Sequence, residues 1–242
     1  MLARLAWMLA SALASAPLRA IDLATAAPPV EIDDLKLTSG PRTLVLPPGH
    51  WLLLDLTHES VSSGASGATV ADNATFAQVE DGKLALGGRL FILRNDALAF
   101  GWSFSPCVSA EDIYLRDRAP NIRQPDCLTV YSRRRGVVGA NANVQLSHKT
   151  TEWLAAHRIE TPEYAVVITY SRYATNTFGA LSLTIPSDRF DSDGAAISWS
   201  ETLRTALKRL FEHREDAGRF PALPPPAAAQ SQPEAEASPS SP

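Results

Sequence analysis

The sequence predicts an α+β fold, in which a mainly antiparallel β-sheet of about six to eight strands packs with two helices, followed by a disordered C-terminal tail. Three observations lead to this prediction. Several segments alternate apolar and polar residues, two-residue turn signals separate some of them, and one segment near the C-terminus carries apolar residues at helical spacing. We expect an extended segment over 27–41, a single domain over 42–216 and a disordered tail over 217–242.

The composition fits a globular protein and gives no basic surface for nucleic acid. Hydrophobic residues make up 45% of the 242 residues, and the formal net charge is −4. Basic residues are nearly all arginine, which together with abundant alanine is typical of a bacterial genome rich in G and C. No nucleotide-binding or metal-binding motif is present, so we expect no cofactor.

Residues 1–26 contain the parts of a secretory signal peptide. A short positive start precedes an apolar run, and small residues follow at 14–16 (Ala-Ser-Ala) and 24–26 (Ala-Thr-Ala). Pro17 disfavours the first cleavage triplet, so we expect a cut after the second and a periplasmic or secreted protein. A disordered leader on a cytoplasmic protein is the alternative, because Arg19 interrupts the signal. No later segment is apolar enough to cross a membrane.

The first part of the domain predicts two strands and a loop. Residues 43–46 form a short expected strand, and Pro47-Pro48-Gly49 is a turn signal. The following strand over 50–57 has apolar residues on both faces, which is typical of a central strand. Residues 60–71 are rich in Ser, Gly and Ala without a period, so we expect a flexible surface loop there.

A β-meander is expected next. Asp81-Gly82 is a strong signal for a two-residue hairpin turn, and Gly87-Gly88 permits a bend. A further strand over 128–132 is expected beyond it. The expected strands of the meander are 76–80, 83–86, 89–94 and 98–104.

The chain contains only two cysteines, Cys107 and Cys127. An even number of cysteines in an exported chain predicts a disulfide. It would close a loop of about 20 residues and stabilise the fold by about 3 kcal/mol in the chain-entropy model. The alternative is that both are unpaired core residues.

The C-terminal part of the domain predicts two helices around a hairpin. A short helix is expected over 150–158, and strands over 164–173 and 178–185 form the hairpin. The last helix is expected to begin at a Ser198–Glu201 capping box and to run to residue 216. Its expected apolar stripe comprises Leu203, Ala206, Leu207, Leu210 and Phe211.

Three patterns in the sequence are candidates for catalysis or metal binding. Residues 101–105 (Gly-Trp-Ser-Phe-Ser) lack the last glycine and the following helix of a nucleophile elbow, so a strand is favoured. The five histidines form no metal motif, although His148 could serve as a base for a distant Ser or Asp. The aspartates at 188, 191 and 193 depart from the calcium-loop pattern, so a solvated turn before the last helix is favoured.

Arginines around the expected disulfide loop form a candidate anion-binding surface. If they converge, they would bind a carboxylate, a phosphate or a polyanionic glycan. Pairing with nearby acidic residues such as Glu111 and Asp117 is the alternative and is favoured. The candidate residues are Arg116, Arg118, Arg123, Arg133, Arg134 and Arg135.

Two functions follow as hypotheses. The first is a non-enzymatic exported bacterial envelope protein that binds another envelope protein or a small anionic ligand. It is motivated by the signal peptide, the disulfide and the missing catalytic signature. The second is a small exported hydrolase, whose Ser, His and Asp residues come together only in three dimensions. The tail over 217–242 could also tether the domain to a larger assembly.

Overall fold

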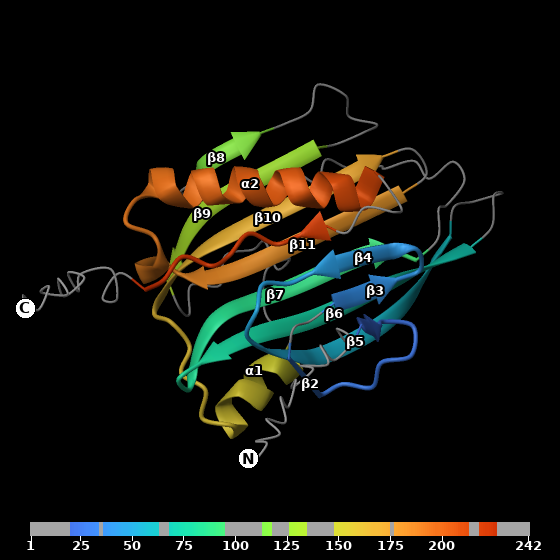
Figure 1. Cartoon of the computed structure of the whole chain (residues 1–242), viewed down its shortest axis with the longest axis horizontal. Helices are drawn as coiled ribbons and strands as arrows, with labels where there is room; N and C mark the ends of the chain where they lie inside the picture. The colour runs from blue at the N-terminus through green and yellow to red at the C-terminus, as the bar shows by residue number, and fades with distance from the viewer. Residues whose placement is uncertain are drawn as a thin grey trace, which may run out of the picture.

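The computed structural model describes residues 20–33, 36–62, 68–94, 113–117, 126–134, 148–174, 177–212 and 218–226. Its main element is an eight-stranded sheet in which every pair of neighbouring strands is antiparallel (Figure 1). The predicted α+β class is confirmed. In spatial order, the strands are β2 (Val30–Asp33), β5 (His50–Ser62), β6 (Ala68–Glu80), β7 (Lys83–Leu93), β11 (Thr177–Pro186), β10 (Tyr164–Ala174), β9 (Asp126–Arg134) and β8 (Ile113–Asp117).

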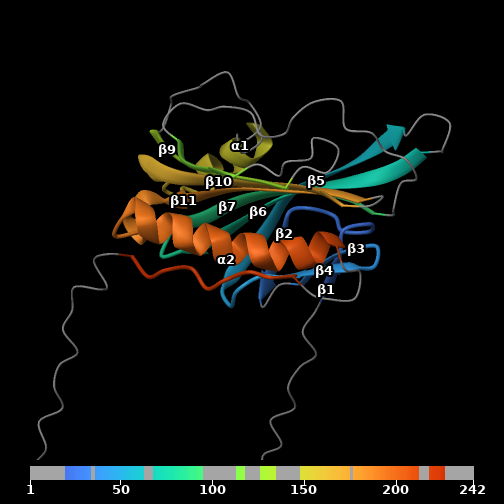
Figure 2. The same cartoon turned by 90° about the horizontal axis from the view of Figure 1, so that it is seen from above.

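A smaller mixed sheet and a long helix, α2 (Asp193–Glu212), cover one face of the main sheet, while α1 (His148–Ala156) lies on the other face (Figure 2). In the smaller sheet, an antiparallel pair is flanked by a parallel strand on each side. Its strands are β1 (Ala20–Asp22), β3 (Lys36–Ser39), β4 (Arg42–Val45) and β12 (Gly218–Arg219). The large core fills the space between these layers. Within the described ranges, no helix is both long and apolar enough to cross a membrane.

Strand β5 is buried on both faces, as its sequence predicts. Trp51 and Leu53 enter the large core under the smaller sheet. Leu52 and Leu54 point to the opposite face and form a second cluster with Leu154 of α1. Both faces are buried because the smaller sheet covers one side of β5 and α1 packs on the other.

The β6–β7 hairpin has the predicted turn, but β7 is one continuous strand. Asp81 and Gly82 both have positive φ, 49° and 74°, as a two-residue hairpin turn requires. The bend expected at Gly87-Gly88 is wrong. A Cβ atom on Gly88 would lie 2.3 Å from the ring of Phe76, so this glycine makes room for an aromatic side chain across the strand pair.

The flexible loop expected over 60–71 is also wrong in large part. Strands β5 and β6 continue to pair as far as Ser62 and Ala68, and only 63–67 lie outside the described residues. Strands pair through backbone hydrogen bonds, which do not require apolar side chains at alternate positions. The polar composition of this segment therefore did not prevent it from forming a strand.

Helix α2 begins earlier than its sequence signals indicate. Ser192 precedes it and accepts a hydrogen bond from the amide of Ala195 at 3.2 Å through its hydroxyl, so it serves as the cap. Ser198 lies inside the helix, and the capping box expected there is wrong. The buried residues Ala196 and Trp199 extend the apolar stripe toward the N-terminus of the helix. The first turn of the helix is polar, so its sequence does not indicate where the helix begins.

The other predicted elements of the C-terminal half are confirmed. Strands β10 and β11 form an antiparallel hairpin with continuous register from Ala165–Pro186 to Ala174–Thr177. The expected strand over 128–132 lies within β9, and the short expected helix corresponds to α1, which begins two residues earlier. The expected strand over 98–104 lies outside the described residues.

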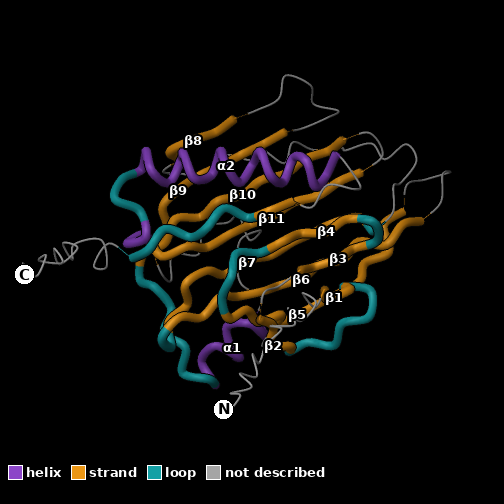
Figure 3. Tube along the Cα trace, viewed as in Figure 1, coloured by secondary structure: helices purple, strands orange, loops and turns teal. Residues whose placement is uncertain are grey.

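The folded part of the chain extends past both expected domain boundaries. Leu23 is fully buried and Phe220 is 3% exposed, and both belong to the large core. After β12, residues 220–226 run as a loop alongside α2 (Figure 3). The indole of Trp199 donates a hydrogen bond to the carbonyl of Ala222 at 2.8 Å and fastens this segment to the helix. Burial of apolar side chains and backbone pairing therefore order residues 218–226, although their proline-rich composition predicts a disordered tail.

Candidate functional site

The side chains of the predicted arginine surface all lie outside the described part of the structure. Arg116 lies on the edge strand β8, opposite Thr129 of β9. Arg133 and Arg134 lie four and five residues further along β9, which corresponds to about 13 Å or more between these backbone positions and Thr129. Arg118, Arg123 and Arg135 lie outside the described residues. Convergence of the six guanidinium groups therefore stays a prediction.

The predicted disulfide also stays a prediction. Cys127 is buried on β9, at 2% exposure, whereas its expected partner Cys107 lies outside the described residues. The same holds for the weak nucleophile pattern at 101–105. Among the described residues, no three His, Cys, Asp or Glu side chains gather to hold a metal ion, the aspartates at 188, 191 and 193 included.

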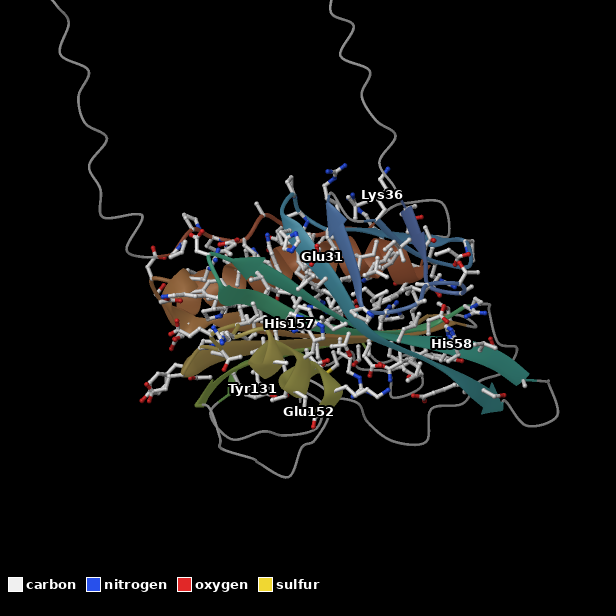
Figure 4. The ribbon with its side chains drawn as sticks, turned by 90° about the horizontal axis from the view of Figure 1, so that it is seen from below. Glu31, Lys36, His58, Tyr131, Glu152 and His157 are labelled. Carbon is white, nitrogen blue, oxygen red and sulfur yellow. The ribbon has the colours of Figure 1, made fainter. Side chains whose placement is uncertain are left out.

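The histidines are distributed over separate parts of the molecule. His157 stacks on Trp153 of α1 with ring centroids 3.8 Å apart, and its Nδ1 lies 2.8 Å from the carbonyl oxygen of Trp153. His58 lies on β5, well apart from His157 in Figure 4. His148 is the first residue of α1. The packing of His157 against its own helix supports a structural role for this residue.

A buried carboxylate on β6 brings together polar side chains from four segments. Asp72 is fully buried and accepts hydrogen bonds from Ser39 of β3 at 2.6 Å and from Arg94 after β7 at 2.5 Å. The Nδ1 atom of His58 lies 2.9 Å from the same carboxylate. Burial alone raises the pKa of Asp72, but hydrogen bonds from Arg94, Ser39 and His58 outweigh this effect and hold the pKa below its ordinary value.

This cluster contains Ser, His and Asp, yet its connectivity differs from that of a catalytic triad. In a triad, the histidine lies between the serine and the carboxylate and takes the serine proton. Here, Asp72 lies in the middle, and the hydroxyl of Ser39 donates directly to it. Ser39 is also buried, at 3% exposure. The arrangement joins the smaller sheet to the main sheet and does not activate the serine as a nucleophile.

A second buried carboxylate fastens α2 to the main sheet. Asp126 at the start of β9 lies 3.0 Å from the Nε of Arg204, 3.4 Å from the Nζ of Lys208 and 3.6 Å from the Nη1 of Arg172. Burial raises the pKa of Asp126, but the hydrogen bond and charge of Arg204 and the charge of Arg172 lower it below its ordinary value. Burial beside this carboxylate raises the pKa of the Tyr170 hydroxyl. Glu212 pairs with Arg172 and Glu201 with Arg204, so three carboxylates face three cations, which supports a structural role.

A cavity of about 600 Å³ lies at the end of the main sheet, where three segments meet and Pro226 of the C-terminal stretch adds to the lining. The three segments are the β6–β7 turn, the residues that lead into β10, and the 3₁₀ helix η3 (Ser187–Arg189) after β11. Backbone hydrogen bonds fix two of these segments to each other. The amide of Glu160 donates to Gly82 at 2.9 Å, and the amide of Leu84 donates to Glu160 at 2.9 Å. The third is tied by the hydroxyl of Ser187, which donates to the carbonyl of Tyr164 at 3.3 Å.

The lining of this cavity is acidic and includes one exposed aromatic ring. Arg189 is buried and pairs with Glu80, while Lys83 lies 3.7 Å from Glu160. Tyr164 is 48% exposed, the highest value among the large hydrophobic residues described. Five carboxylates and two cations line the cavity, which gives a formal charge of −3. The carboxylates are Glu80, Asp81, Glu160, Glu163 and Asp188.

The cavity was not predicted, because its residues come from distant segments. The Asp81-Gly82 turn had a specific sequence signal, and Asp188 belonged to an aspartate pattern that predicted only a solvated turn. The charges at 160–163 and 188 have no spacing that points to a shared site. Comparisons with known proteins add no candidate function: no family model, no curated protein and no solved structure matches the chain.

Proposed function

We propose that the chain is an exported bacterial envelope protein that binds a ligand without catalysing a reaction, and that the cavity at the end of the main sheet is its binding site. The cavity is the observation that carries this proposal, since its volume lies in the range of small-molecule sites. The N-terminal signal pattern supports export. Export is in turn the premise from which the Cys107–Cys127 disulfide is expected.

The charge and the aromatic wall of the cavity favour a cationic group as ligand. An amine or a guanidinium is attracted by the formal charge of −3 and by the face of an exposed aromatic ring. Tyr164 supplies such a ring. A polyamine or a basic side chain of a partner protein has the required chemistry. This ligand differs from the anionic ligand expected from the arginines, which concerns another part of the chain.

The alternative hydrolase has less support from the described residues. Among the described residues, hydrogen bonds connect Ser39, Asp72 and His58, but the carboxylate occupies the place that the histidine takes in a triad. A binding function requires no such activated nucleophile. The acidic cavity therefore gives the better-supported proposal.

The proposal is tested by titrating the purified protein with spermidine and following binding by calorimetry and by amide chemical shifts around 160–164. The double variant Tyr164→Ala, Asp188→Asn removes the ring and one carboxylate, and we expect its affinity to fall about tenfold, which corresponds to about 1.4 kcal/mol. Glu59→Gln is the matched control, because Glu59 lies opposite Ala71, nine residues along β6 from Glu80.

Two results would contradict the proposed site. One is equal spermidine affinity in the wild type and the double variant. The other is tighter binding of an anionic probe, such as inorganic phosphate, than of spermidine, which would favour the predicted arginine surface instead. Raising the ionic strength provides a further check, since a binding energy that comes from charge decreases with salt.

A further inference from the structure

Residues 20–26, which the expected cleavage at 24–26 would remove, belong to the folded domain. Strand β1 pairs in parallel with β3, and Leu23 directly after it is fully buried in the large core. The amide of Leu23 donates a hydrogen bond to the carbonyl of Thr38 at 2.8 Å. The hydroxyl of Thr38 donates in return to the carbonyl of Ile21 at 3.1 Å. Backbone pairing and side-chain burial together fasten this segment.

The downstream triplet at 24–26 forms a tight turn that Asp22 closes. The carboxylate of Asp22 accepts a hydrogen bond from the amide of Ala24 at 2.9 Å. Its carbonyl accepts hydrogen bonds from the amides of Thr25 at 3.1 Å and Ala26 at 3.0 Å. Ala26 also packs against the large core. This turn leads the chain from the smaller sheet toward β2 of the main sheet.

A cut after Ala26 would separate β1 and Leu23 from the mature protein. Strand β3 would then become an unpaired edge, with backbone amides and carbonyls open to other chains. The large core would lose a fully buried leucine and keep a cavity in its place. Maturation at the downstream triplet would therefore remove contacts that stabilise the described fold.

We propose that the signal peptide is cleaved upstream of Ala20, so that the mature chain keeps β1. This inference rests on the proposed export of the chain. Two triplets there have small residues at the first and third positions, Ala12-Leu13-Ala14 and Ala14-Ser15-Ala16. The first places Ser15 after the cut and so avoids the obstacle at Pro17. Hydrolysis of the Ala14–Ser15 peptide bond by a signal peptidase consumes one water, which leaves a carboxylate on the leader and a free amine on the mature chain.

The position of the cut is read directly from the intact mass of the protein, isolated from the periplasm of a Gram-negative host that expresses the full chain. We expect the mature N-terminus to lie between Ser15 and Ala20. Ala14 belongs to both upstream triplets, so Ala14→Glu should block processing and leave the full-length precursor. Ala24→Gln, the matched control in the downstream triplet, should leave the cleavage position unchanged.

The intact mass of the isolated protein distinguishes failure of this inference from failure of the proposed export. A mature N-terminus at Ala27 would overturn this inference while supporting export. A chain that keeps Met1 and stays in the cytoplasm would overturn the proposed export together with the cleavage. Processing that is blocked by Ala24→Gln and unaffected by Ala14→Glu would also overturn the upstream assignment.

Discussion

Replacing Asp72 with asparagine tests whether the buried carboxylate joins the two sheets through charge. The substitution keeps the size of the side chain and removes the charge that faces Arg94, His58 and Ser39. Removing one partner of a buried ion pair costs about 3–5 kcal/mol. The side chains of Arg94 and His58 are 25% and 41% exposed, so water recovers part of this energy. We expect Asp72→Asn to lower the free energy of unfolding by about 2–3 kcal/mol at pH 6.

The effect of this substitution should depend on pH in a defined direction. The pKa of Asp72 lies below its ordinary value in the folded state. Its ionised form therefore stabilises the fold above the unfolded-state pKa, about 3.9, and this contribution is lost as the pH falls through the folded-state value. The difference between the wild type and Asp72→Asn should be complete at pH 6 and should decrease below about pH 4.

Urea unfolding, followed by tryptophan fluorescence at pH 6 and at pH 3, measures both quantities. Asp191→Asn is the control, because Asp191 is exposed and its replacement should change the free energy of unfolding by less than about 0.5 kcal/mol. A difference below about 0.5 kcal/mol for Asp72→Asn at pH 6 would refute the reasoning. An equal difference at both pH values would show that packing, and not charge, accounts for the effect.

Further substitutions test the packing and the ends of the fold by the same unfolding measurement. Gly88→Ala should cost about 1–3 kcal/mol, because its Cβ would lie 2.3 Å from the ring of Phe76; an unchanged midpoint would contradict the close packing of Phe76 on Gly88. Phe220→Ala should cost about 3–5 kcal/mol, because this side chain is 3% exposed in the large core. A loss below about 1 kcal/mol would show that residues 218–226 do not belong to the stable domain. Asp126→Asn should destabilise the fold more at pH 6 than at pH 3, since the pKa of Asp126 is lowered in the folded state; a loss that does not change with pH would contradict the charge-based contact with α2.

The strands and turns whose conformation depends on neighbouring residues were largely predictable. The Asp81-Gly82 turn requires positive φ at both positions, which few residue types adopt, so its sequence signal is specific. Apolar residues alternate with polar residues along β10 and β11, and this alternation directly indicates that one face of each strand is buried. The start of α2 was missed, because its first turn contains polar and small residues that carry no helical period.

The candidate site could not be predicted in the same way. Lys83 and Glu160 form part of one wall of the cavity but lie 77 residues apart, and a bridge between their backbones brings them together. Ser39, His58 and Asp72 come from three separate strands. No spacing in the chain indicates that such residues meet, since their proximity depends on strand order and register.

The sequence by itself determined the α+β class, the two-sided burial of β5 and the hairpins, because each follows from the conformations and apolar faces of residues close together in the chain. Only the tertiary structure decided that β1 and β12 complete a second sheet, that Asp72 joins the two sheets, and that an acidic cavity forms at one end. These features depend on contacts between distant segments. Their stability comes from burial and pairing that exist only after the strands have taken their order in space.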